Sequence, residues 1–247
     1  MTVQIVLCGS GEFTPVMADV DRELLAGLRP RARVAIVPTA AGLEETPTMW
    51  ARMGSEHFRA LGAEPVPIMV VDRAGAEDPR YSDAIADVDW VYFSGGNPGH
   101  LVASLAGTPF WSAVLARLRA GAILAGSSAG AMALGETTFV PLGRGPDGLP
   151  TDVMSRPAFA LVPGVIVVPH FDILPEAILT LWDRLVPRGH RLLGIDEDTA
   201  LLGGEHGWSV RGRGRVLVFG GVEPRVFRAG AGLDGLLPPP LAYTQTT

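Results

Sequence analysis

A serine flanked by glycines, in Gly126-Ser127-Ser128-Ala129-Gly130, is the strongest chemical feature of the sequence. It follows a short apolar run and precedes residues with good helix propensity. On such a strand-to-helix turn a serine hydroxyl stands clear of the backbone, provided that small residues flank it. We therefore predict that Ser128 is a nucleophile and that Ser127 is structural. The competing interpretation is a serine that merely caps a helix in a chain with 31 glycines.

A serine nucleophile needs a base, and five histidines are available. His170 follows the apolar run Val165 to Val168, so it lies where a strand ends. The other four lie in an expected helix or beside loop glycines, which favours structural or solvated roles: His57, His100, His190 and His206. His170 is therefore the predicted base.

The acid that would orient the imidazole is less clearly marked. Asp172 is two residues after His170, and on an extended backbone both side chains would leave the same face. Asp172 is the candidate chosen here, although it could instead cap a following helix. Three other carboxylates remain open as the acid: Asp147, Glu136 and Asp152.

Two backbone amides are candidates for stabilising an oxyanion. The Ala129 amide would lie at a helix N-terminus, where the helix dipole adds to its effect. The Gly96 amide, in Gly95-Gly96-Asn97, would lie at the end of a neighbouring strand. Asn97 in the same segment is a candidate substrate-binding residue.

These residues need a scaffold that brings strand ends together. Five short apolar runs read as strands: Val3 to Cys8, Val34 to Val37, Val66 to Val71, Trp90 to Phe93 and Ala122 to Ala125. Three segments that contain proline near their start read as helices between them: Pro15 to Leu28, Pro47 to Leu61 and Pro109 to Arg119. This alternation predicts an α/β fold with a doubly wound, mostly parallel sheet covered by helices on both faces.

In such a fold, ligands bind at the carboxyl ends of the strands. The loops expected there are glycine-rich or polar: Gly9 to Glu12, Pro38 to Ala40, Ser94 to Asn97 and Gly126 to Ser128. After Ser128 we expect a surface loop over Gly143 to Gly148, a helix from Pro175 to about Val186, strands at Ala200 to Leu202 and Val216 to Phe219, and a frayed tail from Pro238.

Composition excludes several chemistries. The 247 residues contain no lysine, since all 20 basic residues are arginine, so a Ser-Lys dyad, a Schiff-base lysine and a Walker lysine are impossible. A net charge of -6 makes nucleic acid an unexpected partner. The single cysteine, Cys8, fits a reducing cytoplasm. Without a leader-like N-terminus or 18 uninterrupted apolar residues, membrane insertion is not expected. No metal or organic cofactor has a visible site.

Taken together and in this order, four segments resemble peptidase family S51, which contains dipeptidase E and cyanophycinase. The segments are Gly95-Gly96-Asn97, Gly126 to Ala131, Pro169-His170-Phe171 and Gly194 to Ala200. The resemblance implies a single domain over residues 1–247 with a fold similar to class I glutamine amidotransferases. It implies a Ser-His-acid hydrolase with the Gly96 and Ala129 amides as oxyanion hole, and it suggests a homodimer. Asp196 to Ala200 is interpreted as a structural signature without a catalytic role.

The sequence departs from that family in two places. Members usually draw the acid from the loop between serine and histidine, where Asp147 is the nearest match, whereas Asp172 matches a His-x-Glu arrangement in the amidotransferase relatives. Members with an acidic preference carry arginine soon after the histidine, but Ile173 to Trp182 contain none. This argues against an aspartyl preference.

We therefore expect a serine peptidase that acts on short peptides through an acyl-enzyme. A serine esterase is the alternative within enzymes, and a non-catalytic binding protein on the same scaffold is the alternative outside them. A glutamine amidotransferase is disfavoured because its elbow needs a cysteine, and Cys8 lies on the first expected strand.

Overall fold

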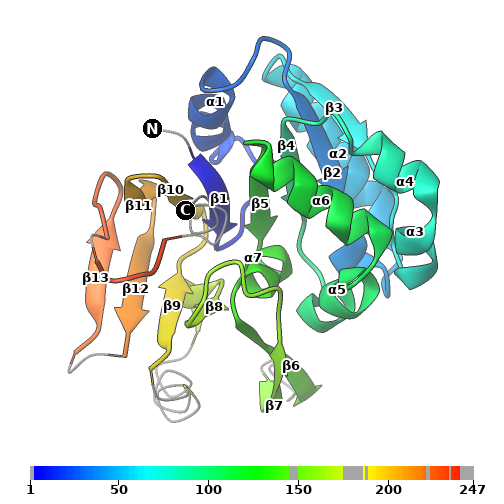
Figure 1. The fold of residues 1–247 in the computed structure, drawn as a ribbon. Helices are drawn as coiled ribbons and strands as arrows, with labels where there is room; N and C mark the ends of the chain where they lie inside the picture. The colour runs from blue at the N-terminus through cyan, green and yellow to red at the C-terminus, as the bar shows by residue number, and fades with distance from the viewer. Residues whose placement is uncertain are drawn as a thin grey trace.

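Two sheets and a hairpin form the strand framework of the molecule (Figure 1). The structure is a computed structural model that describes residues 3–144, 150–174, 186, 189–220, 223–233 and 235–239. The larger sheet has seven strands in the order β11 (Gly207–Gly212), β10 (Thr199–Gly204), β1 (Val3–Cys8), β5 (Ile123–Ser127), β4 (Trp90–Phe93), β2 (Arg33–Val37) and β3 (Glu64–Pro67). The five strands from β1 to β3 in this order are parallel, whereas β10 pairs antiparallel with both neighbours.

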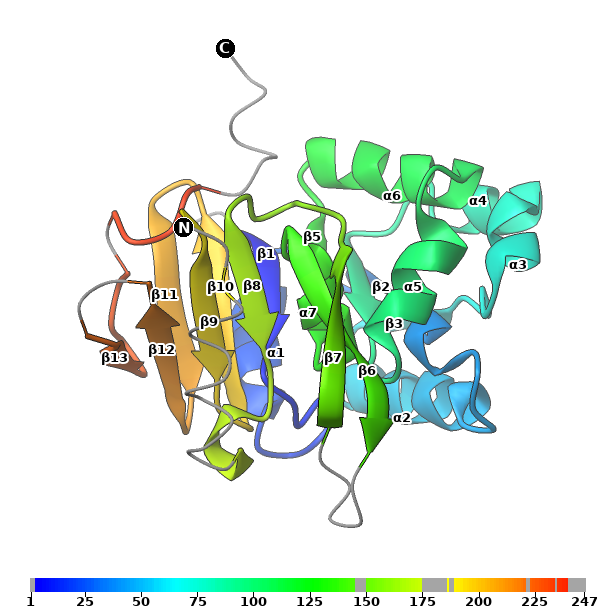
Figure 2. The same cartoon turned by 90° about the horizontal axis from the view of Figure 1, so that it is seen from below.

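Helices cover both faces of this sheet (Figure 2). One face packs against α1 (Ala18–Ala26) and α2 (Pro47–Ala60). The other packs against α3 (Arg73–Glu77), α4 (Pro79–Ala84), α5 (Pro98–Leu105), α6 (Pro109–Arg119) and α7 (Ala129–Leu134). Alternate residues of a strand serve the two layers: Ile5 and Leu7 of β1 belong to one cluster, and Val6 and Cys8 to the other. Because both faces of the central strands are buried, successive residues along them are mostly apolar, as expected for a parallel sheet covered on both sides.

Local signals start the helices. α4, α5 and α6 each begin with proline, and the preceding Asp78, Asn97 and Thr108 accept a hydrogen bond from a backbone amide of the first turn. Proline at that position loses no helical hydrogen bond, and the cap satisfies an otherwise free amide.

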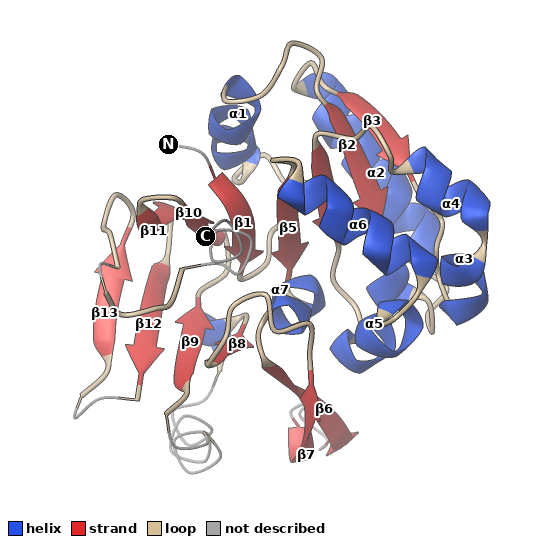
Figure 3. Ribbon diagram, in the orientation of Figure 1, coloured by secondary structure: helices blue, strands red, loops and turns tan. Residues whose placement is uncertain are grey.

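The second sheet has four strands, in the order β13 (Arg225–Arg228), β12 (Arg215–Phe219), β9 (Arg191–Ile195) and β8 (Val165–Val168), and β8 and β9 are parallel (Figure 3). Its Val165, Val167, Leu193 and Ile195 share a hydrophobic cluster with the seven-stranded sheet. The hairpin of β6 (Thr137–Arg144) and β7 (Pro150–Pro157) follows α7.

The predicted α/β fold is confirmed, with three differences. The strand expected over Val66 to Val71 lies at Glu64–Pro67, an edge position where prolines are tolerated because one side needs no ladder bonds. The helix expected from Pro15 begins at Ala18. The strands at Val165 to Val168 and Val216 to Phe219 belong to the separate four-stranded sheet. The expected helix from Pro175, most of the loop over Gly143 to Gly148 and most of the tail lie outside the described residues.

Candidate active site

Ser128 occupies a tight elbow between β5 and α7, with φ 51° and ψ -114°. This backbone conformation is costly for a residue with a side chain, and such strain clusters at functional sites. The flanking glycines are required by close packing. A Cβ on Gly126 would lie 2.4 Å from the Gly130 backbone, and one on Gly130 would lie 2.5 Å from the Phe93 carbonyl oxygen.

His170 lies against this serine. Its Nε2 is 2.9 Å from Ser128 Oγ, and about a third of its side chain is exposed. The residue follows β8 and adopts a left-handed conformation, with φ 53° and ψ 37°. The structure therefore brings together the serine and the histidine chosen from the sequence.

The carboxylate at the imidazole is Glu197 rather than Asp172. His170 Nδ1 is 2.7 Å from Glu197 Oε1. Asp172 Oδ1 instead accepts a hydrogen bond of 2.8 Å from the Glu197 backbone amide. The assignment of Asp172 assumed an extended backbone, but left-handed His170 turns the chain into a 3₁₀ turn over Phe171–Ile173, so the two side chains do not share a face.

The other three carboxylates have different places. Glu136 accepts hydrogen bonds from the Gly164 amide at 2.5 Å and pairs with His190 at 3.0 Å, and these bonds lower its pKa. It anchors the segment before β8, not the imidazole. Asp147 and the side chain of Asp152 lie outside the described residues.

Glu197 was interpreted as part of a structural signature, yet a topological signal would have found it. β8 and β9 are parallel neighbours, with Val168 opposite Gly194. His170 and Glu197 each follow the last residue of their strand by two positions, so their side chains emerge at the same sheet edge. That inference needed Arg191–Ile195 to be recognised as a strand paired with Val165–Val168.

The segment around Glu197 is held by its neighbours. Asp196 is buried, and its Oδ2 accepts hydrogen bonds from the Arg215 amide at 2.9 Å and from Arg215 Nε at 2.8 Å. The pairing raises the pKa of Arg215 further. The Thr199 hydroxyl donates to the Glu197 carbonyl at 3.0 Å. The carboxylate is thus presented by a turn tied on both sides.

Two amides beside Ser128 have no hydrogen-bond partner within the described residues. Among the described residues, neither the Gly96 nor the Ala129 amide donates a hydrogen bond. Gly96 has a φ of 136°, and a Cβ there would lie 2.4 Å from the Ala40 backbone, so only glycine fits. A Cβ on Gly95 would lie 3.8 Å from Ser128 Oγ, which places this loop against the serine.

Comparison with known proteins identifies the family of this chain. The family model described as peptidase family S51 matches residues 5–210. The chain belongs to peptidase family S51. This confirms the resemblance stated from the four sequence segments.

The S51 chain is similar to curated cyanophycinases. It is 29% identical over 197 residues to the cyanophycinase of Nostoc sp., covering 76% of this chain and 63% of that protein. It is 30% identical over 198 residues to the cyanophycinase of Thermosynechococcus vestitus, covering 78% and 59%. The chain thus spans about three fifths of the length of these relatives.

Two solved structures are also similar. A peptidase from an acI-B1 Actinobacterium is 31% identical, with a TM-score of 0.79 over 94% of this chain and 96% of that one. A putative peptidase E from Listeria monocytogenes EGD-e is 18% identical, with a TM-score of 0.61 over 86% and 99%, and supports the fold.

The expected substrate-binding residue of this S51 chain, Asn97, has a structural task as well. Its Oδ1 accepts a hydrogen bond of 2.9 Å from the His100 amide and so caps α5. Asn97 also lines a cavity of about 540 Å³, together with Leu43, His100 and the exposed Arg156. Contact with substrate stays a prediction.

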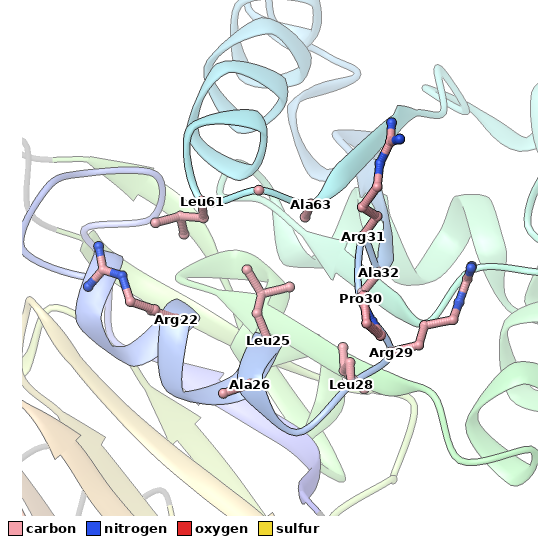
Figure 4. A pocket seen from close by; sticks show the side chains of 11 residues that line it. Arg22, Leu25, Ala26, Leu28, Arg29, Pro30, Arg31, Ala32, Leu61 and Ala63 are labelled. Atoms are coloured by element: carbon pink, nitrogen blue, oxygen red, sulfur yellow. The ribbon is translucent and has the colours of Figure 1, made fainter.

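Another cavity, of about 340 Å³, lies at the end of the sheet where the parallel strands begin (Figure 4). It is bordered by the ends of α1 and α2 and by Arg29 to Ala32, just before β2 begins. Arg29 there is paired with Asp89 at 2.8 Å. Because strand starts rather than strand ends border it, this cavity is separate from the serine.

The described part of the chain contains no group of three or more histidine, cysteine, aspartate or glutamate side chains placed to hold a metal ion. No single helix within it is long and apolar enough to cross a membrane, although α5 and α6 meet the criterion as a pair bent by 96°.

Proposed function

We propose that this chain is a serine peptidase that hydrolyses short peptides through Ser128, His170 and Glu197. The observation that carries the proposal is the continuous series of contacts from Ser128 Oγ to His170 Nε2 at 2.9 Å and from His170 Nδ1 to Glu197 Oε1 at 2.7 Å. The names of the similar proteins, cyanophycinase and peptidase, support a peptide rather than an ester as substrate.

In this mechanism, His170 Nε2 accepts the proton of Ser128 Oγ as the oxygen attacks the scissile carbonyl. Glu197 holds the proton of the imidazole on Nδ1, which leaves Nε2 free as the base, and stabilises the imidazolium that forms. His170 then donates its proton to the leaving amine. Water, deprotonated by the same nitrogen, attacks the acyl carbonyl, and His170 returns that proton to Ser128 Oγ as the acid product leaves.

The Gly96 and Ala129 amides receive the negative charge that develops on the carbonyl oxygen. Each such donor contributes a factor of about 10² to 10³ to kcat. The Ala129 amide is at the start of α7, where free amides point outward from the helix. A composition with one cysteine fits a reducing compartment, which supports a cytoplasmic location as part of this proposal.

The test combines covalent labelling with substrate profiling. A fluorophosphonate should label the wild type at Ser128, located by mass spectrometry, and a dipeptide library should be cleaved faster than p-nitrophenyl esters. Ser128→Ala should lose both labelling and hydrolysis. Ser112→Ala is the matched control, since Ser112 lies on α6 and its Oγ donates to the carbonyl of Thr108, the residue that precedes this helix. Hydrolysis that persists in Ser128→Ala would refute the proposal.

A further inference from the structure

A buried carboxylate lies behind the serine and takes no part in the proton transfer described above. Glu12, in the loop after β1, is 5% exposed. Its Oε1 accepts a hydrogen bond of 2.9 Å from the Gly95 amide, and its Oε2 accepts one of 2.6 Å from Ser127 Oγ. Within the described part of the chain, no arginine or histidine pairs with Glu12. Burying a carboxylate without a cation costs free energy of folding, so the presence of Glu12 at this position needs a reason.

Both partners of Glu12 are directly next to the site. Gly95 precedes Gly96, and Ser127 precedes Ser128 and the Ala129 amide. One carboxylate therefore joins the loop after β4 to the elbow after β5, which are the two segments that supply the free amides.

Backbone hydrogen bonds also hold a further residue of each segment. The Asn97 amide donates to the Ala40 carbonyl at 2.7 Å, and the Ser128 amide donates to the Cys8 carbonyl at 3.0 Å. The free Gly96 amide thus lies between two bonded amides, those of Gly95 and Asn97. Two consecutive glycines have wide conformational freedom, so this segment needs external ties to keep one amide direction.

We propose that Glu12 is a positioning residue that sets the Gly96 and Ala129 amides at a fixed separation around the developing oxyanion. The inference rests on the proposed function, since it concerns the same attack by Ser128. Oxyanion donors act only when they lie about 2.7–3.1 Å from the charged oxygen. A misplacement of about 1 Å can cost about 10² in rate.

The side chain at this position is suited to the task. A carboxylate offers two acceptor oxygens, which match two donors, the Gly95 amide and the Ser127 hydroxyl. In Glu12→Gln, the side-chain oxygen can still accept from the Gly95 amide. The side-chain NH₂ group can only donate to Ser127 Oγ, so the Ser127 hydroxyl hydrogen must turn away. Alanine leaves both donors buried and unpaired. Glu12→Gln should therefore disturb the positions of the two amides less than Glu12→Ala.

The experiment measures two quantities on folded protein: the second-order rate of fluorophosphonate labelling, and the affinity for phenylboronic acid, which forms a tetrahedral anion on the serine. Glu12→Ala should lower both by about 10- to 100-fold. Glu12→Gln should stay within about fivefold of the wild type, and Ser127→Ala should fall between them.

Asp21→Asn is the matched control. Asp21 is another buried acid on the same side of the sheet, where it pairs with His57 at 2.7 Å and contacts neither Gly95 nor Ser127. Its loss should lower the thermal midpoint without changing the labelling rate of folded protein. A purely structural Glu12 would behave in the same way as Asp21.

The outcomes separate the two proposals. Equal labelling of Glu12→Ala and wild type would overturn the role of Glu12 and leave Ser128 as nucleophile. If Glu12→Ala does not fold, Ser127→Ala decides, and an unchanged rate in that variant overturns the inference. A wild type that is not labelled at Ser128 overturns the proposed function and this inference together.

Discussion

The candidate site joins two regions that are held in different ways (Figure 1). The elbow region of β5 and α7 is buried, and its glycines touch neighbouring backbone, so its geometry is set by main-chain packing. The region at the ends of β8 and β9 presents His170 and Glu197, whose side chains are 35% and 41% exposed. There, the turn is held by hydrogen bonds that two carboxylates accept: Asp172 accepts from the Glu197 amide, and Asp196 accepts from the Arg215 side chain.

The difference fits what the proposed mechanism requires of each region. Amides that receive an oxyanion have to be immobile before the reaction, because reorientation would cost part of the stabilisation. In the proposed mechanism, His170 gains a proton and passes it to a leaving group while Glu197 stays ionised beside it, so their region needs room and contact with solvent. Changes in the two regions should therefore affect different measurements.

The largest effect is expected from the acid of the side-chain region. Glu197→Gln replaces the carboxylate at His170 Nδ1 with an amide that can stabilise the wrong tautomer, and kcat should fall by about 10⁴. Steady-state kinetics on the best dipeptide measures this. Asp172→Asn is the matched control, because its side-chain oxygen can still accept from the Glu197 amide, and it should retain activity within about tenfold. Equal losses in the two variants would contradict the assignment of Glu197.

The next effect concerns the backbone region. Gly96→Ala would place a Cβ 2.4 Å from the Ala40 backbone at a φ of 136°, so the segment must move and the amide must turn away. We expect kcat to fall by about 10² to 10³ with KM nearly constant. Gly107→Ala is the control, since Gly107 also has positive φ, of 74°, but no atom near its Cβ position. It should cost about 1–2 kcal/mol of stability without changing kcat.

A smaller effect is expected at the support of the Glu197 turn. Arg215→Met removes the guanidinium bond to buried Asp196, while the backbone bond from residue 215 stays. The free energy of unfolding should fall by about 1–3 kcal/mol, as for other hydrogen bonds to charged groups. Urea denaturation measures it. Arg213 is exposed and lies between β11 and β12, two residues before Arg215. As the control, Arg213→Met should stay within about 0.5 kcal/mol of the wild type.

The smallest effect depends on pH. The Gly164 amide and His190 lower the pKa of Glu136 below its ordinary value of 4.5. The ionised group therefore stabilises the folded state above about pH 4.5, and this contribution is lost as the pH falls through the lowered pKa. Because the side chain is 39% exposed, solvent screening limits it to below about 1 kcal/mol. The free energy of unfolding of Glu136→Gln should approach that of the wild type at acid pH, and the two proteins should have equal activity at each pH.

Much of the fold was predictable because its signals are local. The apolar runs of β1, β2, β4 and β5 and the proline-led helices α2 and α6 were placed within one or two residues. The elbow was recognisable because Gly126 and Gly130 are needed at short range, where the strand and helix touch. By contrast, the four-stranded sheet was missed because it pairs Val165–Val168 with Arg191–Ile195, whose adjacency has no local signature.

The amino-acid sequence by itself determined the strand-to-helix turn that carries Ser128, the strand end that carries His170, and the absence of any lysine chemistry. Only the tertiary structure decided which carboxylates serve them. Glu197 reaches the imidazole through the parallel pairing of β8 and β9, and Glu12 reaches Gly95 and Ser127 across three neighbouring strands of one sheet. The physical reason is that hydrogen bonds between side chains distant in sequence depend on strand order and on the left-handed turn at His170, and neither is encoded by residue spacing.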